Sequence, residues 1–76
     1  MKTVHYAQTC QLIRLAFAIA AKAGNSVRAQ TARALLMGIE PEAIREVVAL
    51  SLPALGSAAA ISAAAWTGAE MGMGLR

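Results

Sequence analysis

Hydrophobic residues in the first third of the chain recur every three or four positions, which is the spacing of one face of an α-helix. The periodic positions are Ala7, Cys10, Ile13, Ala16, Phe17 and Ala20. This pattern predicts a helix over residues 4–23, which ends before Gly24 and Asn25. A second helix is predicted over residues 27–37, with Asn25 or Ser26 as its cap.

Residues 38–47 predict the end of one helix followed at once by the start of the next. Gly38 suits a helix C-terminus because glycine enters the left-handed conformation freely. Pro41 suits the first position of a helix, where its missing N–H costs nothing. Glu42 places negative charge at the positive end of the helix dipole.

The segment that follows Pro41 is apolar on almost every side. It carries no charge between Val47 and Ala69, so as a helix it would be buried in protein or lipid. Pro53 predicts a kink or split between Leu52 and Gly56. Small residues then recur at every fourth position and predict a close helix–helix contact, within the protomer or across an oligomer: Gly56, Ala60, Ala64 and Gly68.

Length and composition indicate one domain over residues 1–76 that needs support from neighbours. Such a small domain is marginally stable unless it is stapled or oligomeric. The single cysteine, Cys10, cannot form an internal disulfide, and no Cys/His cluster has zinc spacing. The chain is 58% hydrophobic and rich in alanine, which favours close helix packing and assembly.

Charge and hydropathy argue against several classes of partner. The net charge of +3 comes from scattered basic residues rather than a patch, which disfavours nucleic-acid binding. The long uncharged run is mostly Ala, Ser and Gly and contains Pro53, so membrane insertion is disfavoured although it stays open. The N-terminus has no apolar core ahead of a cleavage site, and we expect a cytoplasmic protein.

The stretch from residue 11 to 70 resembles the carboxymuconolactone decarboxylase family, including its alkyl hydroperoxidase D branch. The family pattern is an apolar helix, a catalytic loop entering a second helix, a glycine turn with an acidic helix start, and an alanine-rich helix. The matching positions are Gly38, Ile39, Glu42, Ile44, Glu46, Val47, Gly56 and residues 58–65. The resemblance implies an all-α fold that assembles into trimers or hexamers.

The residues that carry catalysis in that family are all replaced in this sequence. The peroxidase branch has Cys-x-x-Cys-x-x-x-His at the start of the second helix and a glutamate one helix earlier. In register with Gly38, the cysteines correspond to Ala23 and Ser26, the histidine to Gln30 and the glutamate to Gln11. The chemistry needs a reactive thiolate, a resolving sulfur and a proton relay. The decarboxylase branch uses the same histidine, so neither activity is expected.

The sequence therefore predicts a small, alanine-rich bundle of two to three helices, the third kinked near Pro53. The function favoured is a non-catalytic, oligomer-forming pseudoenzyme that acts as a scaffold or small subunit of a larger complex. The alternatives are an enzyme with a residual or altered activity in the family pocket and a small membrane-associated subunit. No cofactor or metal is expected, because His5, Cys10 and the methionines form no ligand set. Two interpretations of Gln11 and Gln30 stay open. Either they hydrogen-bond to each other at the place of the family's catalytic pocket, called the former pocket below, or each is a solvated residue on a helix face.

Overall fold

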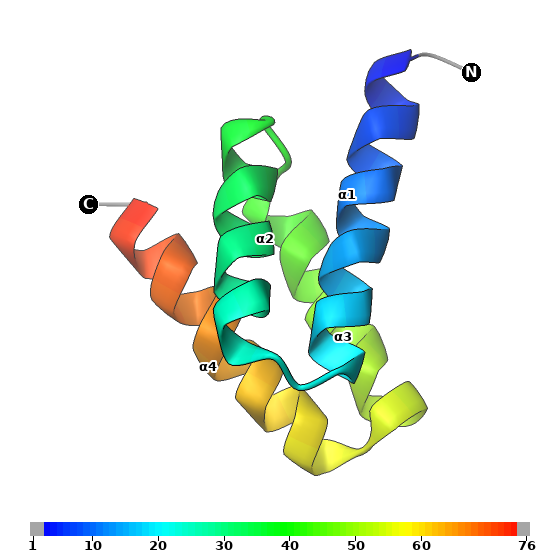
Figure 1. Cartoon of the computed structure of the whole chain (residues 1–76), viewed down its shortest axis with the longest axis vertical. Coiled ribbons are helices and arrows are strands. Elements are labelled where there is room, and N and C mark those ends of the chain that lie inside the picture. Colours follow the sequence, from blue (N-terminus) through cyan, green and yellow to red (C-terminus); the bar gives the residue numbers. More distant parts are fainter. Residues whose placement is uncertain (1–2, 75–76) are drawn as a thin grey trace.

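The computed structural model describes residues 3–74 and the side-chain surroundings of residues 5–72. This part of the chain forms four helices and no strands: α1 (Thr3–Ala20), α2 (Gly24–Leu36), α3 (Pro41–Leu55) and α4 (Ser57–Gly74) (Figure 1). The all-α prediction is confirmed. The expected two to three helices are four, because the third segment divides completely instead of bending.

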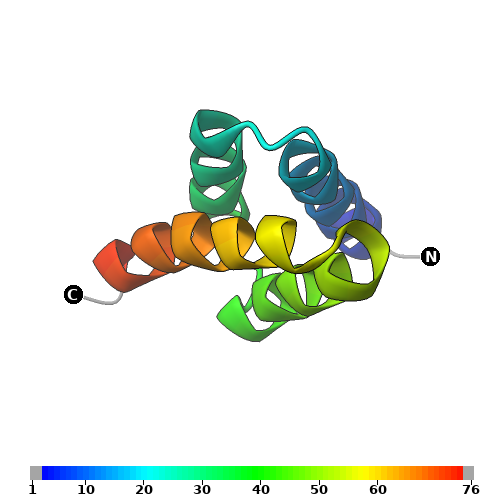
Figure 2. The ribbon, with the colours of Figure 1, turned by 90° about the horizontal axis from the view of Figure 1, so that it is seen from below.

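The helices pack so that α4 lies against both α2 and α3, while α1 rests mainly on α2. Seen from below, α4 runs across the bundle, with α1 and α2 on one side of it and α3 alongside it on the other (Figure 2). The contact between α1 and α3 is less extensive than those of α4 with α2 and α3. This looser pair forms the groove considered below.

The turn between α1 and α2 differs from the prediction. Helix α1 ends at Ala20, and the left-handed position is Lys22, with φ of 55°. The N–H of Ala23 donates to the carbonyl of Ala18 at 3.2 Å, as in a Schellman turn. Gly24 is the first residue of α2 rather than a helix breaker, and the cap position is Ala23, which makes no side-chain cap hydrogen bond.

The other two turns follow the local chemistry of the sequence. Gly38 has φ of 85°, and Pro41 opens α3. Gly56 has φ of 97° and separates α3 from α4, while Pro53 is accommodated in the last turn of α3. The break predicted between Leu52 and Gly56 is therefore confirmed and lies at the glycine.

The core draws on all four helices and one turn residue. Its buried hydrophobic residues include Leu15, Ile19, Val27, Ala34, Ile39, Ile44 and Ala63, and Trp66 packs against them. On α1 the inward side chains are Gln11, Leu15, Ala18 and Ile19. Ile13, Phe17 and Ala20, from the stripe predicted by the sequence, are exposed instead. Helix α1 thus carries two apolar faces, of which the protomer buries one.

The predicted small-residue stripe, which begins at Gly56 and continues along α4, lies mostly away from the core of the protomer. Gly56, Ala64 and Gly68 are exposed and Ala60 is half-buried. A Cβ atom added at Gly56 or Gly68 would meet nothing within 4 Å. The inward face is the neighbouring one: Ala59, Ala63, Thr67 and Met71. A role for the predicted stripe across an oligomer remains a prediction.

Helix α4 continues through Gly74 and is tied to α2 near its C-terminal end. The carboxylate of Glu70 accepts a hydrogen bond from the Nε of Arg28 at 3.0 Å, which joins α4 to α2. Residues 75 and 76 lie outside the described part of the chain.

Candidate functional site

Gln11 and Gln30, which the predicted resemblance aligns with a catalytic glutamate and histidine, are in direct contact. The Nε2 of Gln11 donates to the backbone carbonyl of Gln30 at 2.9 Å and to the Oε1 of Gln30 at 2.9 Å. Gln11 is completely buried and Gln30 is half-buried. The hydrogen-bonded interpretation of the two glutamines is therefore confirmed.

The glutamine pair joins α1 to α2 from inside the bundle. A second amide on the same helix, that of Gln8, points to the carbonyl of Met37 at 3.5 Å. The Oε1 of Gln11 is buried and has no hydrogen-bond partner. Carboxamides neither gain nor lose a proton near neutral pH, so this pair can position helices but cannot relay protons.

The two positions that the predicted resemblance aligns with cysteines lie at the start of α2. Ala23 is the half-buried N-cap residue, and Ser26 is exposed in the first turn. Ser26 precedes Gln30 by four residues, so the two share a face of α2. In the described part of the chain, no hydrogen bond connects the Ser26 hydroxyl to a base.

Other residues with reactive or ligating side chains are dispersed. Cys10 is half-buried on α1, and His5 is exposed near the start of the same helix. Among the residues described, no three His, Cys, Asp or Glu side chains come together as a metal site. Met37 and Met71 pack with the core, while the side chain of Met73 lies outside the described residues.

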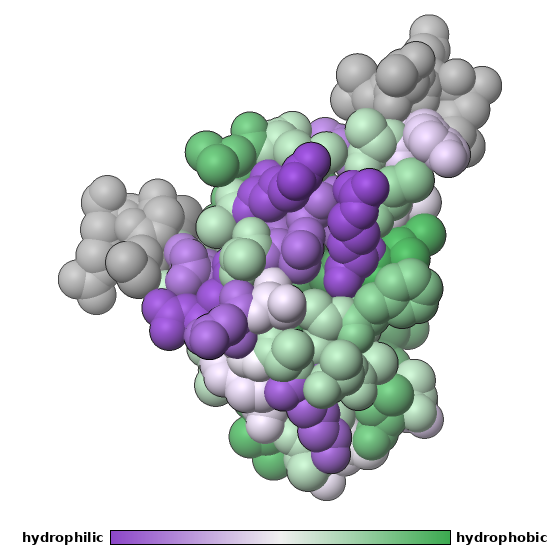
Figure 3. Space-filling model, in the orientation of Figure 1, coloured by the Kyte–Doolittle hydropathy of each residue, from purple (hydrophilic) through white to green (hydrophobic). Residues whose placement is uncertain are grey.

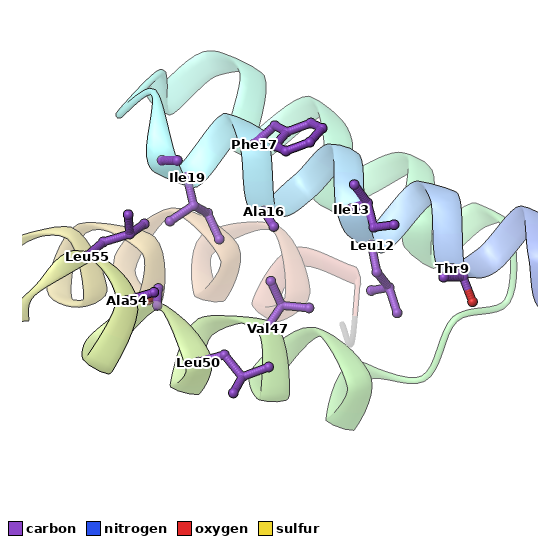
Figure 4. Close-up of a pocket in the computed structure, with 12 residues that line it drawn as sticks. Thr9, Leu12, Ile13, Ala16, Phe17, Ile19, Val47, Leu50, Ala54 and Leu55 are labelled. Carbon is purple, nitrogen blue, oxygen red and sulfur yellow. The ribbon is translucent and has the colours of Figure 1, made fainter.

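An apolar groove with a volume of about 420 Å³ lies between α1 and α3 (Figure 4). Its lining includes Ile13, Ala16 and Phe17 from α1 and Val47, Leu50 and Ala54 from α3. Thr9 and Ser51 are the only polar residues that line it. The Ser51 hydroxyl already donates to the carbonyl of Val48, so the groove offers little polar recognition.

Large apolar side chains on both sides of this groove face solvent. Phe17 is 69% exposed and Leu50 is 68% exposed. Hydrophilic side chains gather over the front of α2, whereas the outer flank of α1 is largely hydrophobic (Figure 3). The groove is not predicted by the hydrophobic pattern of the sequence. The available signal was that α1 has more apolar positions than one face of a helix can hold.

Comparison of the chain with protein-family models, curated proteins and solved structures found no match. The resemblance to the carboxymuconolactone decarboxylase family therefore stays a prediction that rests on the matching positions between Gly38 and Val47, on Gly56 and on the alanine-rich residues 58–65. In the described part of the chain, no helix is both long and apolar enough to cross a lipid bilayer.

Proposed function

We propose that this protein is a non-catalytic assembly module: a cytoplasmic pseudoenzyme of the carboxymuconolactone decarboxylase-like type that forms homo-oligomers and serves as a scaffold or small subunit. The observation that carries the proposal is the apolar surface that the protomer leaves uncovered along α1 and α3. The glutamine pair supports its non-catalytic part.

The assembly part of the proposal follows from how much large apolar surface remains in solvent. Among residues 5–72, eight large hydrophobic residues are at least 43% exposed: Tyr6, Ile13, Phe17, Leu36, Leu50, Leu52, Leu55 and Ile61. Scattered apolar residues are normal on any surface, but several of these gather around one groove. A contiguous apolar patch of more than a few hundred Å² marks an interaction site on a soluble protein.

The non-catalytic part follows from the chemistry of the former pocket. Acid–base or thiol catalysis needs a group that changes its protonation state or attacks as a nucleophile. The two buried groups that meet there are carboxamides, and Gln11 uses its N–H donors on Gln30. Nothing in this arrangement favours the alternative of an altered activity over a positioning role.

The test is the mass of the full-length chain in solution, measured by native mass spectrometry and by light scattering after gel filtration without detergent. We expect a defined multiple of the 7.8 kDa protomer, and the resemblance points to a trimer or hexamer. A monodisperse protomer at micromolar concentration would overturn the proposal. If the chain stays in solution only when detergent is present, the result would instead favour the membrane-associated alternative.

A further inference from the structure

The outward face of α1 has the residue spacing of a helix–helix seam. Its positions alternate steps of three and four residues along the helix: Tyr6, Thr9, Ile13, Ala16 and Ala20. This is the a/d spacing by which one helix packs against another. The protomer uses the opposite face of α1 for its own core, so the outward seam has no helix across it beyond the looser contact with α3.

Helix α3 presents a matching row on its side of the groove. Ala43, Val47, Leu50 and Ala54 are spaced by four, three and four residues. The groove between the two rows has small residues within it, Ala16 and Ala54, and large ones beside it, Phe17 and Leu50 (Figure 4). One face of the molecule therefore has both an apolar ridge, formed by Ile13 and Phe17, and a recess, the α1/α3 groove, into which such a ridge can pack.

Charge does not favour a charged or polar partner. No lining residue of the groove is ionisable. Of the charged residues of α3 nearest in sequence, Arg45 falls on the side of the helix turned away from the groove-lining row, whereas Glu46 lies one turn before Leu50 and borders the row. The groove itself has no charge and combines ridge with recess, so it is complementary to itself.

The apolar area on this face approaches the size that a stable pair of subunits requires. The exposed fractions of Tyr6, Ile13, Phe17, Leu50 and Leu55 are 62, 47, 69, 68 and 43%. With roughly 200 Å² for a fully exposed large side chain, these five residues expose on the order of 600 Å². A standard interface buries about 800 Å² on each partner. These five side chains therefore supply most of the area that one copy would bury.

We infer that the occupant of the α1/α3 groove is a second copy of this chain, bound in an isologous pair. The ridge of Ile13 and Phe17 from one copy enters the groove of the other, and the reverse contact forms at the same time. This inference rests on the proposed assembly function and specifies its geometry. Because a two-fold contact joins subunits in pairs, the assembly has an even number of copies, such as a dimer or a hexamer.

The inference is tested with Phe17→Lys and Leu50→Lys, which place a charge on the ridge and beside the recess. Leu36→Lys is the matched control, because Leu36 is 88% exposed on α2 and does not line the groove. All three sites are exposed, so circular dichroism should show unchanged helix content. We expect an even-numbered wild-type assembly and a rise in the dissociation constant of the pair by about 30-fold or more in both groove variants. The control should assemble as the wild type does.

The outcomes separate this inference from the proposed function. An oligomer that both groove variants leave intact, or a simple trimer, would overturn the two-fold contact while leaving the assembly function in place. A wild-type chain that is monomeric would contradict both the assembly function and the two-fold contact. A monomer whose melting temperature rises with added decanoic acid would assign the groove to an alkyl chain and would likewise overturn the inference.

Discussion

The indole of Trp66 lies against Gly24 so closely that the glycine has no room for a side chain. A Cβ atom built at Gly24 would stand 2.8 Å from Cε2 and 2.9 Å from Cζ2 of Trp66. Gly24 has no positive φ, so its backbone conformation does not require glycine. The requirement is the close approach of α4 to the first turn of α2.

Gly24→Ala should therefore destabilise the protein. Alanine normally stabilises a helix by up to about 1 kcal/mol relative to glycine, but overpacking against the indole should cost about 1–3 kcal/mol. The control is Gly72→Ala on α4, where an added Cβ meets nothing within 4 Å and stability should rise slightly. Urea unfolding followed by circular dichroism measures both changes. If the two variants shift the midpoint in the same direction, the proposed steric requirement is wrong.

Substitution of Gln11 should reveal what the buried amide contributes. Gln11→Met removes a buried oxygen that has no partner together with a donor to Gln30, so we expect a change in stability within about 1 kcal/mol. Gln11→Glu keeps the shape but introduces an ionisable group into a site with no solvent exposure. Burial disfavours the charged form and raises the pKa of the new carboxyl above its unfolded value.

The sign of the resulting pH dependence is fixed. Because the folded-state pKa is raised, Gln11→Glu should be most like the wild type below the unfolded pKa of about 4.3 and lose stability as pH rises through the folded pKa. Parallel unfolding curves for the wild type, Gln11→Met and Gln11→Glu at acid and neutral pH measure this. A Gln11→Glu variant whose stability relative to Gln11→Met does not fall at neutral pH would show that water reaches the site.

No thiol-dependent peroxidase activity is expected. Cys10 is half-buried on α1, and no second cysteine is present to resolve an oxidised sulfur. Peroxide consumption with a dithiol reductant should match the rate without protein. Turnover that disappears in Cys10→Ser would contradict this prediction and support the alternative of an altered enzyme.

The parts of the fold that the sequence predicts well are those determined by local chemistry. Gly38 and Pro41 mark a helix end and start whatever they pack against, and Gly56 supplies the left-handed residue that ends α3. The contact of Gln11 with Gln30 was one of two interpretations, because a glutamine at helical spacing suits a solvated face equally well.

The choice of buried face could not be predicted in the same way. Helix α1 has apolar residues around most of its circumference, and only tertiary packing decides that Leu15 rather than Phe17 is buried. The sequence predicts the end of α1 three residues too late, because a lysine, Lys22, takes the left-handed position usually held by glycine. The α1/α3 groove depends on how two helices sit together, which no single periodicity encodes.

Helix α4 shows the same ambiguity and allows a sharp test. Its Ala-, Ser- and Gly-rich sequence gives almost every face a small-residue stripe, and the larger Trp66, Thr67 and Met71 accompany the inward one. Ala63 is completely buried, whereas its neighbour Ala64 is exposed. The two residues have the same side chain and lie in the same helix, so they form a matched pair.

Ala63→Leu should cost about 1–3 kcal/mol or more, because three extra carbons must enter a packed core that holds no space for them. Ala64→Leu adds the same atoms to an exposed position, so the stability of the protomer should change by less than about 0.5 kcal/mol. Thermal unfolding and light scattering of both variants are the measurements. Weaker assembly of Ala64→Leu with an unchanged protomer would place the stripe of Gly56, Ala60, Ala64 and Gly68 in a subunit contact. Equal destabilisation of the protomer by the two substitutions would contradict the inward face assigned to α4.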